Sequence, residues 1–167
     1  MSVNTVKARW VLLIVMALMV GVVAFPAPAL TQDKPADNMQ VLREKVKADK
    51  KLVVATNMGL TESEAKGFWP VYDDYQKDLT TINQRIVKLI ESYAADYRTN
   101  TLTDEKAKKL IDEFVAIEQA EAGLKASYVP KLNKVLPPKK VARYLQIENK
   151  IRAVVKYELA AGVPLVQ

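Results

Sequence analysis

Carboxylates are the side chains of this protein best suited to acid–base chemistry, because the sequence contains no histidine and no cysteine. The first absence removes the usual general base near neutral pH and the commonest transition-metal ligand, and the second removes thiolates and disulfides. Two groupings, Asp73-Asp74 with Asp78 and Asp112-Glu113, have the residue types of paired acid and base catalysts. Both fall on the polar faces of the helices predicted below, where charge is ordinary. We therefore expect no enzymatic activity, no cofactor and no metal site.

The longest periodic stretch, residues 61–97, predicts the helix around which the chain is arranged. Its apolar residues recur three and four positions apart, which is typical of a helix packed along another helix. The same spacing returns over residues 104–135, with an interruption at Glu121, after a short polar link. We therefore predict an antiparallel helical hairpin. The predicted contact residues are Ala65, Phe68, Tyr72, Tyr75, Leu79, Ile82, Ile86, Leu89 and Tyr93, then Ala107, Leu110, Phe114, Ile117, Leu124, Tyr128 and Val135.

Two shorter helices are predicted on either side of the hairpin. The first begins near Met39 and stops at Gly59, because glycine is the residue most often found just past a helix end. The last covers residues 138–161 and stops at Gly162. With five glycines and no strand-like alternation, the chain is predicted to be all-α, with four helices in one domain over residues 39–167. The last helix is predicted to turn inward Val141, Tyr144, Leu145, Ile151, Val154, Val155 and Leu159.

Three helix starts share one arrangement, in which a leucine precedes the cap and a small apolar residue follows five positions later. Thr61 fits a capping box, Thr103 fits a simple cap, and Pro138 suits a first helical turn. Pro70 and Pro130 lie inside helical patterns, where each removes one hydrogen bond. The hairpin is therefore predicted to be bent.

Residues 1–29 have the composition of a secretory signal peptide. A positive start is followed by an uninterrupted run of apolar residues and glycine over residues 10–25, and by small residues at Ala27-Pro28-Ala29. An uncleaved membrane anchor is the alternative, but the run is shorter than the roughly 20 residues that a bilayer core requires. We predict cleavage near Ala29, a flexible lead-in over residues 30–38 and a periplasmic location.

Positive charge is concentrated toward the end of the chain. Residues 125–167 carry nine Lys and Arg against two Asp and Glu, whereas residues 30–124 carry 14 against 17. A solvated helix face is the plainer interpretation, and a surface for anionic partners is the alternative. Nucleic acid is not an expected partner of an exported chain, which leaves acidic unfolded chains, anionic lipid surfaces or an acidic partner protein.

An aromatic run near the start of the first long helix is denser than a helix requires. Core packing accounts for Phe68 and Tyr72, because they share one side at helical spacing. Trp69 and Tyr75 have two interpretations: core packing, or exposure beside Pro70 as an apolar contact for a partner.

Glu148 falls within the apolar stripe of the last helix, and Glu121 interrupts the apolar stripe of the second hairpin helix in the same way. A buried carboxylate without a partner is costly. We therefore expect Glu148 to pair with a cation such as Arg85 or Arg152 and to fix the register of the helices.

This layout resembles the Spy and CpxP family of periplasmic proteins, whose motif is Leu-Thr-x-x-Gln at two helix starts. Its counterparts here are Leu60-Thr61-Glu62-Ser63-Glu64 and Leu136-Pro137-Pro138-Lys139-Lys140, which keep Leu in both copies, Thr in one and Gln in neither. The resemblance covers residues 41–156. It implies antiparallel homodimers with a concave face that holds unfolded or partly folded chains without ATP, or that reports envelope stress to a membrane sensor kinase.

Two functions therefore follow as expectations. The first is a chaperone-like binding protein that captures unfolded or partly folded proteins, and the alternative is a regulatory adaptor that docks on a periplasmic sensor domain or another membrane protein. The residues predicted to form the client- or partner-binding surface are Trp69, Tyr75, Lys131, Lys134, Lys139, Lys140, Arg143 and Lys150.

Overall fold

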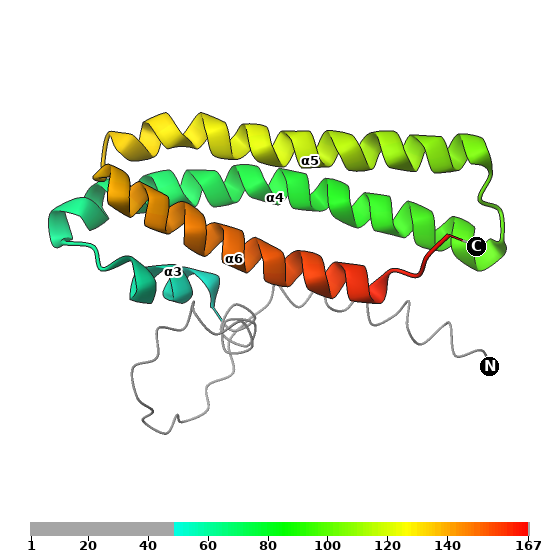
Figure 1. The fold of residues 1–167 in the computed structure, drawn as a ribbon, viewed down its shortest axis with the longest axis horizontal. Coiled ribbons are helices and arrows are strands. Elements are labelled where there is room, and N and C mark those ends of the chain that lie inside the picture. The colour runs from blue at the N-terminus through cyan, green and yellow to red at the C-terminus, as the bar shows by residue number, and fades with distance from the viewer. Residues whose placement is uncertain (1–48, 167) are drawn as a thin grey trace, which may run out of the picture. The chain divides into compact units, whose positions relative to one another are not determined.

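The computed structural model describes residues 49–166, and within them every regular element is a helix (Figure 1). The elements are α3 (Lys50–Met58), α4 (Glu62–Thr99), α5 (Asp104–Asn133) and α6 (Pro138–Gly162). This confirms the predicted all-α class, with a long hairpin between a short helix and a last helix. The predicted signal peptide, the lead-in and the first part of the predicted first helix lie outside the described residues.

Contacts divide the described chain into two compact units, and each is described by itself. The hairpin unit comprises Thr61–Val141 with residues 165 and 166, and therefore holds α4, α5 and the first turn of α6. The second unit, called here the α3–α6 unit, comprises residues 49–60 with Ala142–Pro164. The organisation of residues 39–167 as one domain stays a prediction.

In the hairpin unit, α4 and α5 lie side by side and run in opposite directions, as predicted (Figure 1). Their buried residues run from Phe68 to Ile82 in α4 and from Ile117 to Leu132 in α5, away from the link between the helices. Nearer the link between the helices, Ile86, Leu89, Tyr93 and Leu110 are only partly buried. The buried apolar residues of the two helices are Phe68, Tyr72, Tyr75, Leu79, Ile82, Ile117, Tyr128 and Leu132.

The prediction for Phe114 is wrong, because its side chain is 55% exposed. Between Leu110 and Ile117 the side of α5 that faces α4 is taken by Glu113, which accepts two hydrogen bonds from Arg85 of α4. A two-helix contact buries only a narrow stripe of each helix, so Phe114, one position further on, falls at its edge.

Local signals fix the helix ends. Thr61 accepts a hydrogen bond from the amide of Glu64, and the Glu64 carboxylate accepts one from the amide of Thr61, which confirms the capping box. Thr103 accepts from the amide of Lys106, and α6 begins at Pro138, as predicted. Gly59 has φ 57° and ψ 49°, a left-handed conformation that glycine adopts without steric cost. Because these signals need only neighbouring residues, the sequence reveals them.

The two prolines lie inside the helices, Pro70 in α4 and Pro130 in α5, as predicted. The bending of the hairpin stays a prediction. Asn100 ends α4 in a left-handed conformation with φ 53°, which asparagine tolerates better than most residues.

Side chains of α3 and α6 meet in the α3–α6 unit. Lys50 Nζ lies 2.9 Å from Glu148 Oε2, and the Arg143 guanidinium donates to the backbone carbonyl of Asn57. Glu148 is only 3% exposed, so the prediction that it is buried and paired is confirmed. Lys50 was not among the expected partners, because no local pattern relates residues so far apart in sequence.

Arg85 and Arg152 were the partners expected for Glu148. Arg85 is engaged by Glu113 in the hairpin unit. Arg152 is itself buried, as is Glu121 of α5.

The apolar face of the last helix largely follows the prediction. In α6, Val141, Tyr144, Ile151 and Val154 are buried as predicted, and Ile147 is buried in addition. Leu145, Val155 and Leu159 are partly buried.

Two helical glycines provide a matched test of the hairpin packing. A Cβ at Gly67 would lie 2.9 Å from Val135 Cβ and 3.0 Å from its Cγ1, whereas a Cβ at Gly123 would meet nothing within 4 Å. Alanine gains about 1 kcal/mol of helix propensity over glycine, but overpacking costs about 1–3 kcal/mol. We expect Gly67→Ala to lower the melting temperature and Gly123→Ala to raise it. Equal stabilisation by both variants in thermal unfolding would show that Gly67 is not closely packed.

Candidate functional site

The predicted aromatic contacts lie in the first half of α4. Trp69 is partly buried, and its ring meets those of Phe68 and Tyr72 edge-on, with centroids 5.0 Å and 5.4 Å apart. The accessible part of Trp69 keeps it among the candidate binding residues. Phe68 and Tyr72 are buried, as core packing predicted.

Tyr75 is not a surface contact. Its side chain is only 3% exposed, and its ring packs edge-on against Tyr128 of α5 at a centroid distance of 5.2 Å. The reason is its position, since Tyr75 follows Phe68 and Tyr72 along the line of α4 that faces α5. We therefore remove Tyr75 from the candidate surface and assign it to the hairpin core.

The predicted lysines of the hairpin unit gather where α5 ends and α6 begins. Lys131, Lys134 and Lys139 are exposed. Lys131 Nζ lies 3.9 Å above the centroid of the Tyr128 ring, and Lys140 forms an ion pair with Glu64 at the start of α4. The free surface charge at this end of the hairpin is therefore smaller than the sequence suggests. Neither Lys134 nor Lys139 forms an ion pair within residues 49–166.

The remaining two predicted cations belong to the α3–α6 unit. Arg143 is exposed and donates to the Asn57 carbonyl, while Lys150 is partly buried. Both lie on α6. They are therefore not part of the surface that is built by the hairpin unit alone.

Tyr128 links the two long helices by a hydrogen bond. Its hydroxyl donates to Asp78 Oδ2 of α4 at 2.6 Å. Burial of the phenol, then its hydrogen bond to Asp78, and then the carboxylate charges of Asp78 and Asp74 raise the pKa of Tyr128 to about 12. Asp78 is thus a hydrogen-bond acceptor that positions a core tyrosine.

Three large apolar side chains of α5 lie together in solvent. Ile111, Phe114 and Val115 are 60%, 55% and 45% exposed. Positions three and four apart share one face of a helix, so the three side chains form a continuous patch, called here the α5 patch. Sequence reasoning placed Phe114 in the core and did not consider Ile111 or Val115. The sequence does indicate that Ile111 and Val115 are exposed, because both fall outside the three- and four-residue spacing of the contact residues predicted for this helix.

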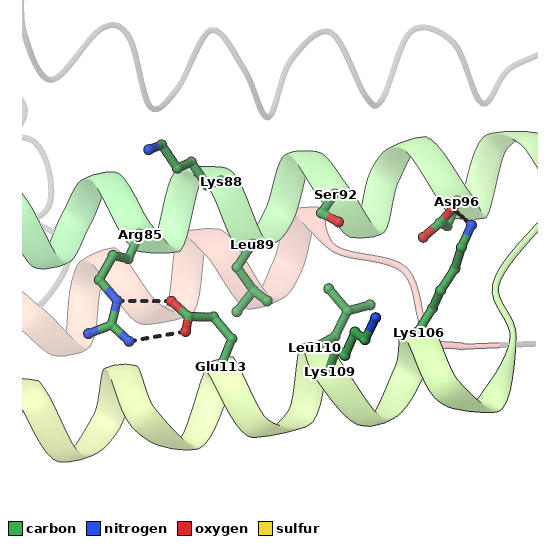
Figure 2. Close-up of a pocket in the computed structure, with 9 residues that line it drawn as sticks. All are labelled: Arg85, Lys88, Leu89, Ser92, Asp96, Lys106, Lys109, Leu110 and Glu113. Atoms are coloured by element: carbon green, nitrogen blue, oxygen red, sulfur yellow. Dashed lines mark hydrogen bonds and ion pairs between the residues drawn. The ribbon is translucent and has the colours of Figure 1, made fainter.

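A pocket of about 420 Å³ lies between α4 and α5, in the half of the hairpin near their link (Figure 2). Its two ends are marked by ion pairs. Arg85 Nε and Nη2 donate to the two carboxylate oxygens of Glu113 at 2.9 Å and 3.1 Å. The nine lining residues are Arg85, Lys88, Leu89, Ser92 and Asp96 from α4 and Lys106, Lys109, Leu110 and Glu113 from α5.

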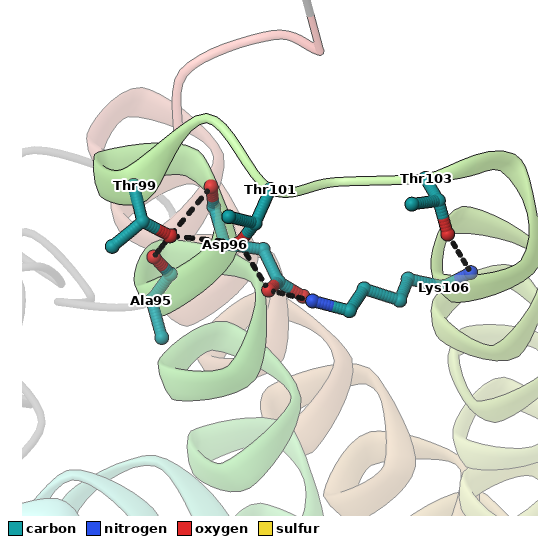
Figure 3. A network of polar contacts seen from close by, with 6 residues as sticks. All are labelled: Ala95, Asp96, Thr99, Thr101, Thr103 and Lys106. Carbon is teal, nitrogen blue, oxygen red and sulfur yellow. Dashed lines mark hydrogen bonds and ion pairs between the residues drawn. The ribbon is translucent and has the colours of Figure 1, made fainter.

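The other end of the pocket is tied to the interhelical link. Lys106 Nζ donates to Asp96 Oδ1 at 2.6 Å, and Thr101 of the link donates to the same oxygen at 3.0 Å (Figure 3). The Thr101 amide also donates to the Asp96 carbonyl at 3.0 Å. Asp96 therefore fixes the end of α4, the link and the first turn of α5 with one side chain and one carbonyl.

The ion pairs hold the pocket carboxyl groups in their charged forms. The hydrogen bond from Lys106, followed by that from Thr101, lowers the pKa of Asp96, and the hydrogen bonds from Arg85 lower the pKa of Glu113. The same contact raises the pKa of Arg85. At neutral pH both carboxylates are therefore ionised and already occupied by protein cations.

The described helices offer neither a metal centre nor a membrane span. Within residues 49–166, no three His, Cys, Asp or Glu side chains meet in an arrangement that would hold a metal ion. None of the described helices combines the length and the apolar character needed to cross a bilayer.

Comparison with known proteins adds no assignment, since no protein-family model, curated protein or solved structure matches this chain. The class defined by fold and surface is an all-α hairpin protein that presents an apolar patch and a lysine-bearing pocket on its two long helices.

The Tyr128–Asp78 hydrogen bond gives a pH-dependent prediction. A raised pKa means that the bond contributes its full stability below pH about 10, the ordinary pKa of tyrosine, and loses it as the pH rises through about 12. We expect Tyr128→Phe to lower the free energy of unfolding by about 1 kcal/mol at neutral pH. In an ultraviolet titration, the variant should lose one phenol that ionises near pH 12. The control Tyr157→Phe changes a 68% exposed tyrosine and should leave that late step intact.

Proposed function

We propose that this protein is a periplasmic, ATP-independent, chaperone-like binding protein of the Spy and CpxP type, which transiently holds unfolded or partly folded chains. The observation that carries the proposal is the α5 patch, whose three large apolar side chains are 45–60% exposed on an otherwise charged helix. A contiguous exposed apolar patch is a kind of surface at which proteins bind partners.

Exposed charge elsewhere in the hairpin unit supports capture by weak contacts. Lys131, Lys134 and Lys139 are exposed at the end of α5 and the start of α6, at the opposite end of α5 from the α5 patch. Exposed cations attract acidic segments over a range that salt shortens, whereas apolar contacts hold them at short range. Binding of this kind is fast, reversible and weaker at high ionic strength. The partly accessible Trp69 adds an aromatic contact.

A regulatory adaptor is the alternative, in which the same patch docks on the periplasmic domain of an envelope sensor or another membrane protein. The spacing of Ile111, Phe114 and Val115 favours it, because anchors at i, i+3 and i+4 are those of a helix that inserts into a groove. A pull-down from an envelope extract separates the two functions. An adaptor retains one dominant partner, whereas a chaperone retains many.

The α5 patch can be removed without disturbing the core. We expect the double variant Phe114→Ser/Val115→Ser to suppress the aggregation of a denatured client several-fold less than the parent protein, as followed by light scattering at low salt and stoichiometric protein. Its melting temperature should change little, because substitutions of exposed residues stay within about 0.5 kcal/mol.

The matched control is Tyr157→Ser on α6, which removes an apolar side chain of similar exposure from the other unit. It should suppress aggregation as well as the parent does. Equal activity of the double variant and the parent would contradict the role of the α5 patch. No suppression by the parent at low salt would contradict the chaperone function itself.

A further inference from the structure

We propose that the pocket between α4 and α5 is a binding site for a small anionic amphiphile, with an acidic headgroup held at Ser92 and Lys109 and a single short alkyl chain lying on Leu89 and Leu110. This inference goes beyond the proposed function, because it needs neither a client protein nor the α5 patch.

The charges of the pocket lining favour an anion. Its two carboxylates are occupied, Glu113 by Arg85 with two hydrogen bonds and Asp96 by Lys106 at 2.6 Å. Lys88 and Lys109 have no such partner, since neither forms an ion pair within the described residues. The pocket lining therefore includes two exposed lysines whose charges no described side chain pairs.

The polar groups for a headgroup come from both helices. Figure 2 places Ser92 of α4 between Leu89 and Asp96, with Leu110 and Lys109 across from it on α5. Ser92 makes no hydrogen bond through its side chain to any described residue, so its hydroxyl is free to donate. An ammonium and a hydroxyl together supply charge-assisted hydrogen bonds to a carboxylate or a phosphate. Lys88 extends away from α5 in Figure 2, and it adds positive charge to the α4 side.

The apolar part of the ligand follows from the leucines. Leu89 and Leu110 are partly buried and line the pocket between its two ion pairs (Figure 2). An alkyl chain laid across them would remove their remaining apolar surface from water, which is favourable. A volume of about 420 Å³ is near the lower end of ligand pockets, so it suits one short chain and not a two-chain lipid.

The pocket is largely formed before a ligand arrives. The Arg85–Glu113 pair at one end is bidentate, which fixes direction as well as distance between the helices. At the other end Asp96 joins Lys106 to Thr101 of the link. Ligand binding therefore loses little conformational entropy in ordering the helices, which favours affinity.

The test uses the full-length protein and isothermal titration calorimetry with octanoate and octyl phosphate below their micelle concentrations. Two headgroups on the same chain separate carboxylate from phosphate recognition. Inorganic phosphate, which lacks the chain, and octanol, which lacks the charge, should each bind at least about tenfold more weakly than the better amphiphile. Saturable binding of at least one amphiphile at one site per chain is the expected result.

Variants locate the site. Lys88→Gln/Lys109→Gln should weaken binding about tenfold and reduce its dependence on salt, and Ser92→Ala should weaken it less. The control Lys108→Gln removes a neighbouring exposed lysine that pairs with Asp112 and does not line the pocket, so it should leave affinity unchanged.

Three results would overturn the proposal: no saturable binding of either amphiphile, equal affinity in the double variant and the parent, or binding to phosphatidylglycerol vesicles alone. The last would assign the lysines to a membrane surface. None of these measurements depends on aggregation suppression, so failure of the pocket and failure of the chaperone function are distinguishable.

Discussion

The narrow apolar contact between α4 and α5 is the constraint on which the hairpin unit depends. Two helices in contact bury one stripe each, and whatever lies outside the stripe stays in water unless another element covers it. Here the stripe is dense where the first half of α4 meets the second half of α5, with Phe68, Tyr75 and Leu79 of α4 and Tyr128 and Leu132 of α5 all buried. Toward the link the contact residues Ile86, Leu89, Tyr93 and Leu110 are only partly buried.

Ion pairs join the two helices where the apolar contact weakens. Arg85–Glu113 and Asp96–Lys106 join the helices in the half near the link. Partly exposed pairs contribute little stability, but they fix orientation. This half therefore combines modest cohesion with defined geometry, and it carries both the α5 patch and the pocket. Surfaces for other molecules are commonly found in the less stable part of a fold.

Much of the fold could be predicted, because its signals are local. The capping box at Thr61, the cap at Thr103, the helix end at Gly59 and the periodicity of α4 each depend on residues within a turn or two. The candidate site was less accessible to such reasoning. Phe114 lies outside the core because Glu113 turns inward to meet Arg85, a residue on the other helix.

Pairing across the fold was the weakest part of the prediction for the same reason. Burial of Glu148 follows from its place in an apolar stripe, but its pairing with Lys50 depends on how α3 lies along α6. Tyr75 shows the opposite case, since its spacing was sufficient to assign it to the core and only the density of aromatic residues around it suggested a surface role.

Amide hydrogen exchange resolved by residue tests the central claim, that cohesion falls along the hairpin from its apolar half to its ion-paired half. Amides of residues 68–82 and 117–132 should exchange at least about tenfold more slowly than those of residues 86–97 and 107–114. Equal protection along both helices, or greater protection near the link, would contradict the account.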